Sequence, residues 1–204
     1  KKFKKQIDAC FTEIKKSNVQ ELYIDLRDNL GGMLRAQEYV LSYLNLSGAP
    51  LQMNYLYKRS EFDRFASLPF YQERQFMNRA ERVYPNGLIS QEYDFYKSPL
   101  GTTRTILYAY TPQNKLNFTY KGKCSLITNG SSMSASVLFA GWFKSTLRGE
   151  IIGTQCMGGV GGTFGNSAPY TLDHSNIHLM VSTLKFTPKD RSSIELKAIE
   201  PDHV

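Results

Sequence analysis

The sequence predicts an α/β protein whose sheet is largely buried between helices. Two stretches support this fold class, residues 22–45 and residues 124–147. In each, a short apolar run of strand length leads through a turn into a helical repeat of apolar side chains. With 204 residues and 41% hydrophobic content, the chain is large enough for one domain with its own core.

The first half is expected to hold two helices and one strand. Residues 2–17 place apolar side chains at intervals of three and four, as in an amphipathic helix: Phe3, Ile7, Cys10, Phe11 and Ile14. On that face Cys10 is expected to be buried as a small apolar residue. Residues 22–26 predict a buried strand that enters a turn at Gly31-Gly32, and residues 34–45 follow as a helix.

Residues 48–122 differ in composition from the rest of the chain. They are rich in Tyr, Phe, Arg and Gln and contain several turn signals, at Pro69, at 85–87 and at 99–101. We interpret this stretch as an insertion or lid over the core, because long irregular connections are usually functional or mobile. An ordinary peripheral subdomain is the alternative, and residues 60–83 could include a helix.

The second half is expected to complete the sheet. Strands are predicted at 124–128, 151–152 and 176–187, a helix at 134–147, a glycine-rich loop at 158–165 and a turn at 199–202. The helix has apolar residues nearly all round and should be buried. The glycine-rich loop lacks the lysine and the following helix of a phosphate-binding loop, so it predicts no nucleotide site.

Composition argues against several classes of partner. The net charge is +7, but the basic residues are dispersed apart from the amino-terminal lysines, which fit a solvated helix face, so no nucleic-acid partner is predicted. No apolar run approaches the roughly 20 residues that cross a bilayer. Metal-ligand spacing is absent, and neither metal nor cofactor is predicted. This holds for all cysteines and histidines: Cys10, Cys124, Cys156, His174, His178 and His203.

Ser134 is the candidate nucleophile. It stands where a strand and a tight turn lead into a helix, and there the helix dipole and free backbone N–H groups favour developing negative charge. A serine needs a base to take its proton and donors to hold the oxyanion. The alternative is that Ser131, Ser132 or Ser134 only caps the helix. Gly31-Gly32 could likewise turn an N–H toward a substrate or simply form a turn.

Four segments together resemble the tail-specific, or C-terminal-processing, serine protease family. The most specific is Asp25-Leu26-Arg27-Asp28-Asn29-Leu30-Gly31-Gly32, which resembles the family's D-L-R-x-N-x-G-G signature. Residues 125–136 resemble its strand followed by S-A-S, residues 149–153 the segment before its T-x-G-K turn, and residues 195–202 its closing G-[IV]-x-P-D. They occur in family order across residues 20–202.

The resemblance implies a ClpP/crotonase-like α/β core with a mixed sheet, and a serine endopeptidase that acts on polypeptides. Ser134 would be the nucleophile. The N–H of Ala135, with one from Gly31 or Gly32, would form the oxyanion hole. Asp25, Arg27 and Asn29 would brace the turn. The family's members are usually exported, which implies a periplasmic or extracellular protein.

The family's general-base lysine is replaced here by Gly159, and no lysine lies between Lys144 and Lys185. The tricorn-like branch of the family instead uses a histidine supported by a glutamate, and Glu195 matches that glutamate. The matching histidine belongs to a segment before the first motif. This chain has none there and begins without Met, so we expect an amino-terminal part, with a possible membrane anchor, to be missing and this piece alone to be inactive.

Two other functions stay open at this point. The missing base and the Tyr-rich stretch also suit a non-catalytic protein that binds a peptide or an apolar ligand on the same fold. A crotonase-like acyl-CoA enzyme is the third possibility, because a fold does not fix a function.

Overall fold

The computed structural model describes residues 2–60, 95, 98–111, 113–146, 148–159, 161–189 and 197–204. The chain divides into two compact units. The core unit comprises Lys1–Gln52, Ala109–Thr163 and Pro188–Val204. The sheet unit comprises Met53–Tyr108 and Phe164–Thr187. Most of the possible helix at 60–83 lies outside the described residues, as does Glu195.

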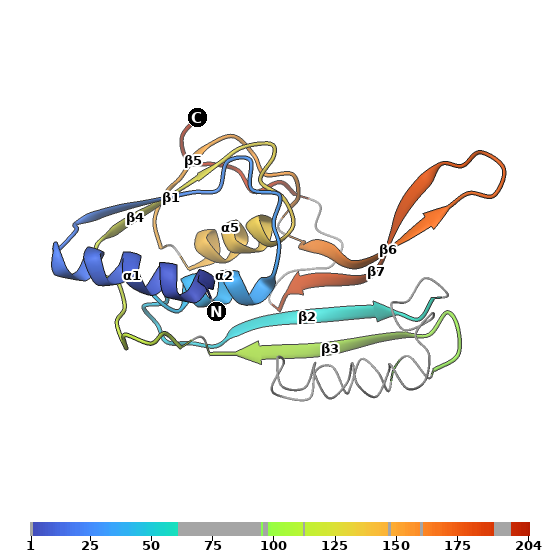
Figure 1. The fold of residues 1–204 in the computed structure, drawn as a ribbon, viewed down its shortest axis with the longest axis horizontal. Helices are drawn as coiled ribbons and strands as arrows, with labels where there is room; N and C mark the ends of the chain where they lie inside the picture. The colour runs from blue at the N-terminus through green and yellow to red at the C-terminus, as the bar shows by residue number, and fades with distance from the viewer. Residues whose placement is uncertain are drawn as a thin grey trace. The chain divides into compact units, whose positions relative to one another are not determined.

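A three-stranded parallel sheet organises the core unit, with β1 (Glu21–Asp25), β4 (Lys123–Thr128) and β5 (Ile151–Gly153) in the order β1-β4-β5 (Figure 1). The register aligns Leu22 with Cys124 and Leu126 with Ile151. The three strands confirm the positions predicted for them. The prediction that residues 22–26 form a buried strand was wrong about burial, because no residue of β1 is buried and Tyr23 is exposed. Because parallel strands end at the same edge of a sheet, the turns that leave β1 and β4 are brought together there.

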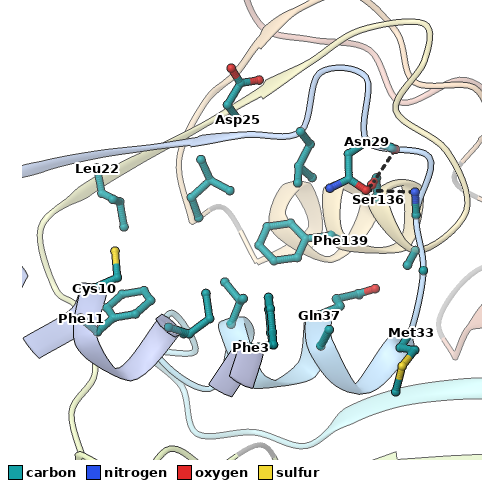
Figure 2. A pocket seen from close by; sticks show the side chains of 18 of the residues that line it. Phe3, Cys10, Phe11, Leu22, Asp25, Asn29, Met33, Gln37, Ser136 and Phe139 are labelled. Carbon is teal, nitrogen blue, oxygen red and sulfur yellow. Dashed lines mark hydrogen bonds between the residues drawn. The ribbon is translucent and has the colours of Figure 1, made fainter. Parts of the chain in front are cut away.

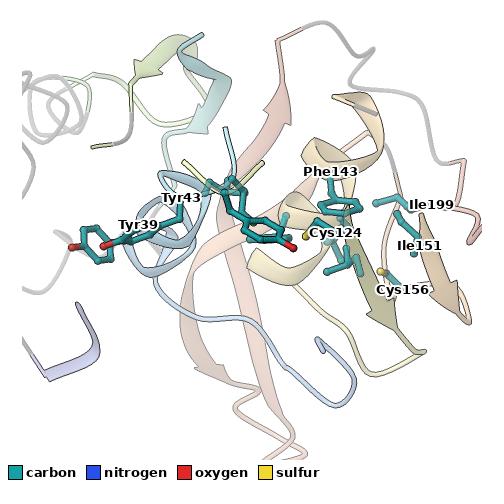
Figure 3. Close-up of a cluster of buried hydrophobic side chains, with 14 of the residues drawn as sticks. Tyr39, Tyr43, Cys124, Phe143, Ile151, Cys156 and Ile199 are labelled. Atoms are coloured by element: carbon teal, nitrogen blue, oxygen red, sulfur yellow. The ribbon is translucent and has the colours of Figure 1, made fainter. Parts of the chain in front are cut away.

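Within the described ranges, three helices pack on this sheet: α1 (Lys2–Lys16), α2 (Leu34–Leu41) and α5 (Ala135–Ser145). Seven of the eleven residues of α5 are buried, which confirms the predicted buried helix. Its side chains join those of the strands in one apolar cluster (Figure 3), whose fully enclosed members include Leu126, Phe143 and Ile151. Burial of each such side chain stabilises the folded state by about 1.5–3 kcal/mol relative to leaving it exposed. The predicted α/β class is therefore confirmed.

Helix α1 is held to α2 at a polar contact beside an aromatic stack. The hydroxyl groups of Tyr39 and Tyr43 both donate to Asp8 Oδ1, and the Phe11 and Tyr43 rings stack with centroids 4.1 Å apart. Burial alone would raise the pKa of Asp8, but the two hydroxyl donors bring that pKa below its usual value. Cys10, on the same helix, is exposed, so the prediction of a buried Cys10 was wrong.

The sheet unit is built on four strands in the order β3-β2-β7-β6: β2 (Leu51–Lys58), β3 (Thr103–Tyr110), β6 (Thr163–Thr171) and β7 (His178–Pro188). Strand β7 confirms the strand predicted at 176–187. The glycine-rich loop was predicted to reach residue 165, but β6 already begins at Thr163. Strands β2 and β3 lie within residues 48–122, whose interpretation as an insertion or lid remains a prediction. Tyr55 stacks on Tyr108, with ring centroids 5.3 Å apart.

Candidate functional site

The turns after β1 and β4 are tied together by side chains from the second turn. Asn129 Oδ1 accepts hydrogen bonds from the N–H groups of Asp28 and Ser131, each at 3.0 Å. Its Nδ2 donates to Asp28 Oδ1, also at 3.0 Å. Ser132 is fully buried, donates to the Leu26 carbonyl at 2.7 Å and accepts from the Asn129 N–H at 3.0 Å. One asparagine and one serine thus link two segments about a hundred residues apart in sequence.

The first turn is also braced from within. Arg27 donates to Asp25 through its backbone N–H at 2.9 Å and through its guanidinium group at 2.7 Å. These hydrogen bonds lower the pKa of Asp25 to about 2. Asn29 Oδ1 accepts from the Gly31 N–H at 3.0 Å and from Ser136 Oγ at 3.0 Å (Figure 2). The bracing role expected for Asp25, Arg27 and Asn29 is confirmed by these bonds.

Ser134 has an unusual backbone conformation, with φ 53° and ψ −116°. A residue with a Cβ rarely adopts such angles, because they cost about 1–3 kcal/mol and persist only where the surrounding structure enforces them. Ser134 is the residue that precedes α5, yet its side chain makes no capping hydrogen bond. The alternative that Ser134 caps the helix is therefore wrong. Ser134 is only partly buried, so its hydroxyl group is not enclosed in the core.

Gly31 lies directly against the Ser134 turn. A Cβ at Gly31 would stand 2.6 Å from Ser134 Cβ, 2.7 Å from the Met133 carbonyl oxygen and 2.9 Å from the Ala135 nitrogen. The φ of Gly31 is +92°, which also favours glycine. Its N–H is already bonded to Asn29. Among the described residues, the N–H groups of Gly32 and Ala135 have no hydrogen-bond acceptor.

The segment that follows β5 passes beside this turn. Met157 pairs with Met133 in a parallel bridge, and the Met157 N–H donates to the Ser132 carbonyl at 3.0 Å. Gly159, which we predicted to stand at the family's lysine position, is two residues further on. The three segments that meet here, residues 25–36, 129–137 and 154–163, contain no lysine and no histidine.

The three histidines lie elsewhere in the structure and are not part of this arrangement. His174, His178 and His203 are all exposed. His178 Nδ1 lies 2.9 Å from Thr171 Oγ1, and His203 Nε2 lies 3.7 Å from Glu150 Oε1. Within the described ranges, no three His, Cys, Asp or Glu side chains are grouped as metal ligands would be. Glu195 lies outside those ranges, so its predicted role stays a prediction.

A cavity of about 510 Å³ opens beside the first turn, within the core unit (Figure 2). Its walls are mainly apolar side chains of α1, β1, α2 and α5, among them Phe3, Ile7, Phe11, Leu22, Val40 and Phe139. Gly31, Gly32 and Ala135 also line it. Sequence reasoning missed this cavity and missed Gln37, which projects into it from α2. No local sequence signal distinguishes Gln37 from the other polar residues of a helix.

Solved structures with a similar fold include several proteases. The photosystem II D1 C-terminal processing protease matches with 16% identity and a TM-score of 0.56, covering 100% of this chain and 39% of that one. Mature CPAF complexed with lactacystin matches with 16% identity and a TM-score of 0.59, covering 99% and 41%. A putative S41 protease from Bacteroides fragilis matches with 14% identity and a TM-score of 0.51, covering 94% and 39%.

At these identities the likeness establishes the fold alone, and the chain spans about two fifths of the length of these structures. No curated protein matches the sequence. In the part of the chain that the structure describes, no helix is long and apolar enough to cross a membrane. The sequence profile of peptidase family S41 matches residues 1–204. The chain therefore belongs to peptidase family S41, as its resemblance to the tail-specific proteases predicted.

Proposed function

We propose that this chain is the catalytic core of a serine endopeptidase and that Ser134 forms the acyl-enzyme. The observation that carries the proposal is the Ser134 backbone, which has a φ of 53° although the Ser134 side chain makes no capping hydrogen bond. Strain of this kind gathers at functional sites, where it orients a reacting group. Membership of family S41 supports a peptidase that acts on polypeptides.

In the proposed reaction, Ser134 Oγ attacks the carbonyl carbon of the scissile peptide bond while a general base takes the hydroxyl proton. The tetrahedral oxyanion would accept hydrogen bonds from the Ala135 N–H and the Gly32 N–H. We favour Gly32 over Gly31 as the second donor, because the Gly31 N–H is already bonded to Asn29. Collapse of the intermediate breaks the C–N bond, the base returns its proton to the leaving amine, and water then hydrolyses the ester on Ser134.

The general base is the one group of this mechanism for which the three segments at Ser134 offer no lysine or histidine. Gly159 carries no side chain, and no lysine or histidine is present in the three segments that meet at Ser134. We propose the tricorn-like arrangement, in which a histidine from outside this chain acts as the base and Glu195 orients it. Loss of such a base lowers the rate by several orders of magnitude, so this piece alone should be inactive.

Labelling with a fluorophosphonate tests this proposal. The reagent is applied to the 204-residue chain and to the full-length protein, each also as Ser134→Ala and, as a matched control, Ser131→Ala. We expect label on the full-length protein and on its Ser131→Ala variant, none on Ser134→Ala, and little on the short chain. Full-length protein that stays unlabelled, while shown to be folded, would contradict the proposal.

A non-catalytic binding protein is the second candidate, and the apolar cavity beside Gly31 is the observation that favours it. In that case the full-length protein would bind peptides and leave them intact. Proteolysis that is abolished by Ser134→Ala would exclude it.

For location we propose an exported protein, periplasmic or extracellular, with any membrane anchor in a segment outside this chain. The support is its family, most of whose members are exported. The test is fractionation of cells that express the full-length protein, and recovery of all of it from the cytoplasmic fraction would contradict the proposal.

A further inference from the structure

The cavity beside the first turn adjoins the proposed oxyanion donors. It is lined by Gly32 and Ala135, whose N–H groups are the proposed oxyanion donors, and by Gly31 between them. Its volume of about 510 Å³ is well above the roughly 150 Å³ that holds a benzene molecule in a protein core. An aromatic side chain as large as that of tryptophan therefore fits.

The polar side chains on the cavity wall are engaged, with one exception. Asp25 is paired with Arg27, and Asn29 is hydrogen-bonded to Ser136. Gln37 Oε1, in contrast, is buried and has no hydrogen-bond partner in the described part of the chain. Figure 2 shows the Gln37 side chain projecting from α2 toward the turn that carries Asn29.

A buried carbonyl oxygen without a donor is costly, and the cost is recovered when a ligand supplies the donor. The ligand group must be apolar over most of its surface and must carry one neutral donor at its end. A lysine side chain is disfavoured, because Asp25, the one carboxylate among the described residues of the wall, is already paired with Arg27. Tyrosine and tryptophan meet both requirements, since each has an apolar body and a single polar N–H or O–H group.

We infer that this cavity receives an aromatic side chain of the polypeptide substrate and that Gln37 is the residue that selects Tyr or Trp over Phe. The inference rests on the proposed function for the identity of the ligand as a polypeptide. A preference built on one neutral hydrogen bond should amount to about two- to tenfold in binding.

Cys10 gives a readout of the occupied cavity that requires no catalysis. It lines the cavity and is exposed, whereas Cys124 and Cys156 are buried and burial raises the pKa of both thiols. N-ethylmaleimide should therefore alkylate Cys10 first, and a ligand in the cavity should slow that reaction. The experiment uses the full-length protein with Ser134→Ala, and peptide mapping by mass spectrometry follows Cys10 alone.

The probes are the N-acetyl amides of tyrosine, tryptophan, phenylalanine and aspartate. We expect the tyrosine and tryptophan amides to protect Cys10 at concentrations about two- to tenfold lower than the phenylalanine amide, and the aspartate amide not to protect. In Gln37→Leu, and in the near-isosteric Gln37→Met, this difference should vanish while protection by the phenylalanine amide is kept. The two variants are compared with the parent protein by circular dichroism.

Equal protection by the tyrosine and phenylalanine amides, or a preference that survives both substitutions, would overturn the role of Gln37. If none of the aromatic amides protects Cys10, the inference that the cavity binds an aromatic side chain would be overturned. Fluorophosphonate labelling of Ser134 does not depend on the protection of Cys10. Labelled Ser134 with unprotected Cys10 would indicate a peptidase with a different specificity. Protected Cys10 with unlabelled Ser134 would indicate a binding protein without catalysis.

Discussion

Gly31→Ala is the substitution that most directly tests how the site is built. An alanine Cβ would lie 2.6 Å from Ser134 Cβ and 2.9 Å from the Ala135 nitrogen, both well inside van der Waals contact. Gly32→Ala is the matched control, because Gly32 also has a positive φ, of +144°, but a Cβ added there would have nothing within 4 Å. Both variants carry backbone strain of about 1–3 kcal/mol. Only Gly31→Ala adds a clash, which costs about 1–3 kcal/mol more.

The free energy of unfolding, measured by urea titration, should therefore fall further for Gly31→Ala than for Gly32→Ala, by about 2 kcal/mol. The midpoint of thermal unfolding should differ by about 4–8 °C in a chain of this length. The added methyl group also covers the Ala135 N–H, so labelling of Ser134 in the full-length Gly31→Ala protein should slow about 100-fold, as when an oxyanion donor is removed. Equal stability of the two variants would refute the close packing of Gly31 on the Ser134 turn.

Three further outcomes are expected. Ser134→Gly should be about 1 kcal/mol more stable than Ser134→Ala, because glycine relieves the strained φ, and urea titrations giving the reverse order would count against that strain. Asp202 accepts hydrogen bonds from the Ile151 N–H and from the Lys144 ammonium group, and both lower the pKa of its carboxyl group below 3.8. Its stabilisation is thus present above pH 3.8 and lost as the pH falls through the lower folded-state pKa, so Asp202→Asn should flatten the acid limb of a stability–pH curve. Ellman's reagent should titrate Cys10 rapidly in the native chain and all three cysteines only in urea; three fast thiols without urea would contradict the packing of the other two.

The elements of the core unit could be predicted because each has a local signal. Short, mainly apolar runs mark β1 and β4, glycines mark the first turn, and apolar residues nearly all round mark α5. Strands β2 and β3 were missed although residues 106–110 form an apolar run, because the composition and turn signals of residues 48–122 were interpreted as one irregular stretch. Cys10 was placed in the core because periodicity shows which face of a helix is apolar, but not whether a cavity lies next to that face.

The site was predictable only in part, for a related physical reason. The resemblance drew attention to Ser134, Ala135 and the two glycines, but a positive φ at a serine leaves no trace in the sequence. The hydrogen bonds of Asn129 to Asp28 join residues 101 positions apart, and the buried oxygen of Gln37 depends on what the neighbouring helices leave empty. Such features arise from packing between distant segments, which local patterns do not encode.

The link between Asp28 and Asn129 has a consequence for how this chain can change in length. The two turns are closed onto each other across a span of 101 residues, and the entropy of closing a flexible loop grows only with the logarithm of its length. Doubling that span would cost about 0.6 kcal/mol, less than the about 1–3 kcal/mol expected if the fully buried Ser132 hydroxyl, which also joins the two turns, lost its partners. Extra residues in an exposed connection of this span, such as residues 46–50, should therefore cost little free energy, whereas the few side chains that join the turns cannot be exchanged so freely.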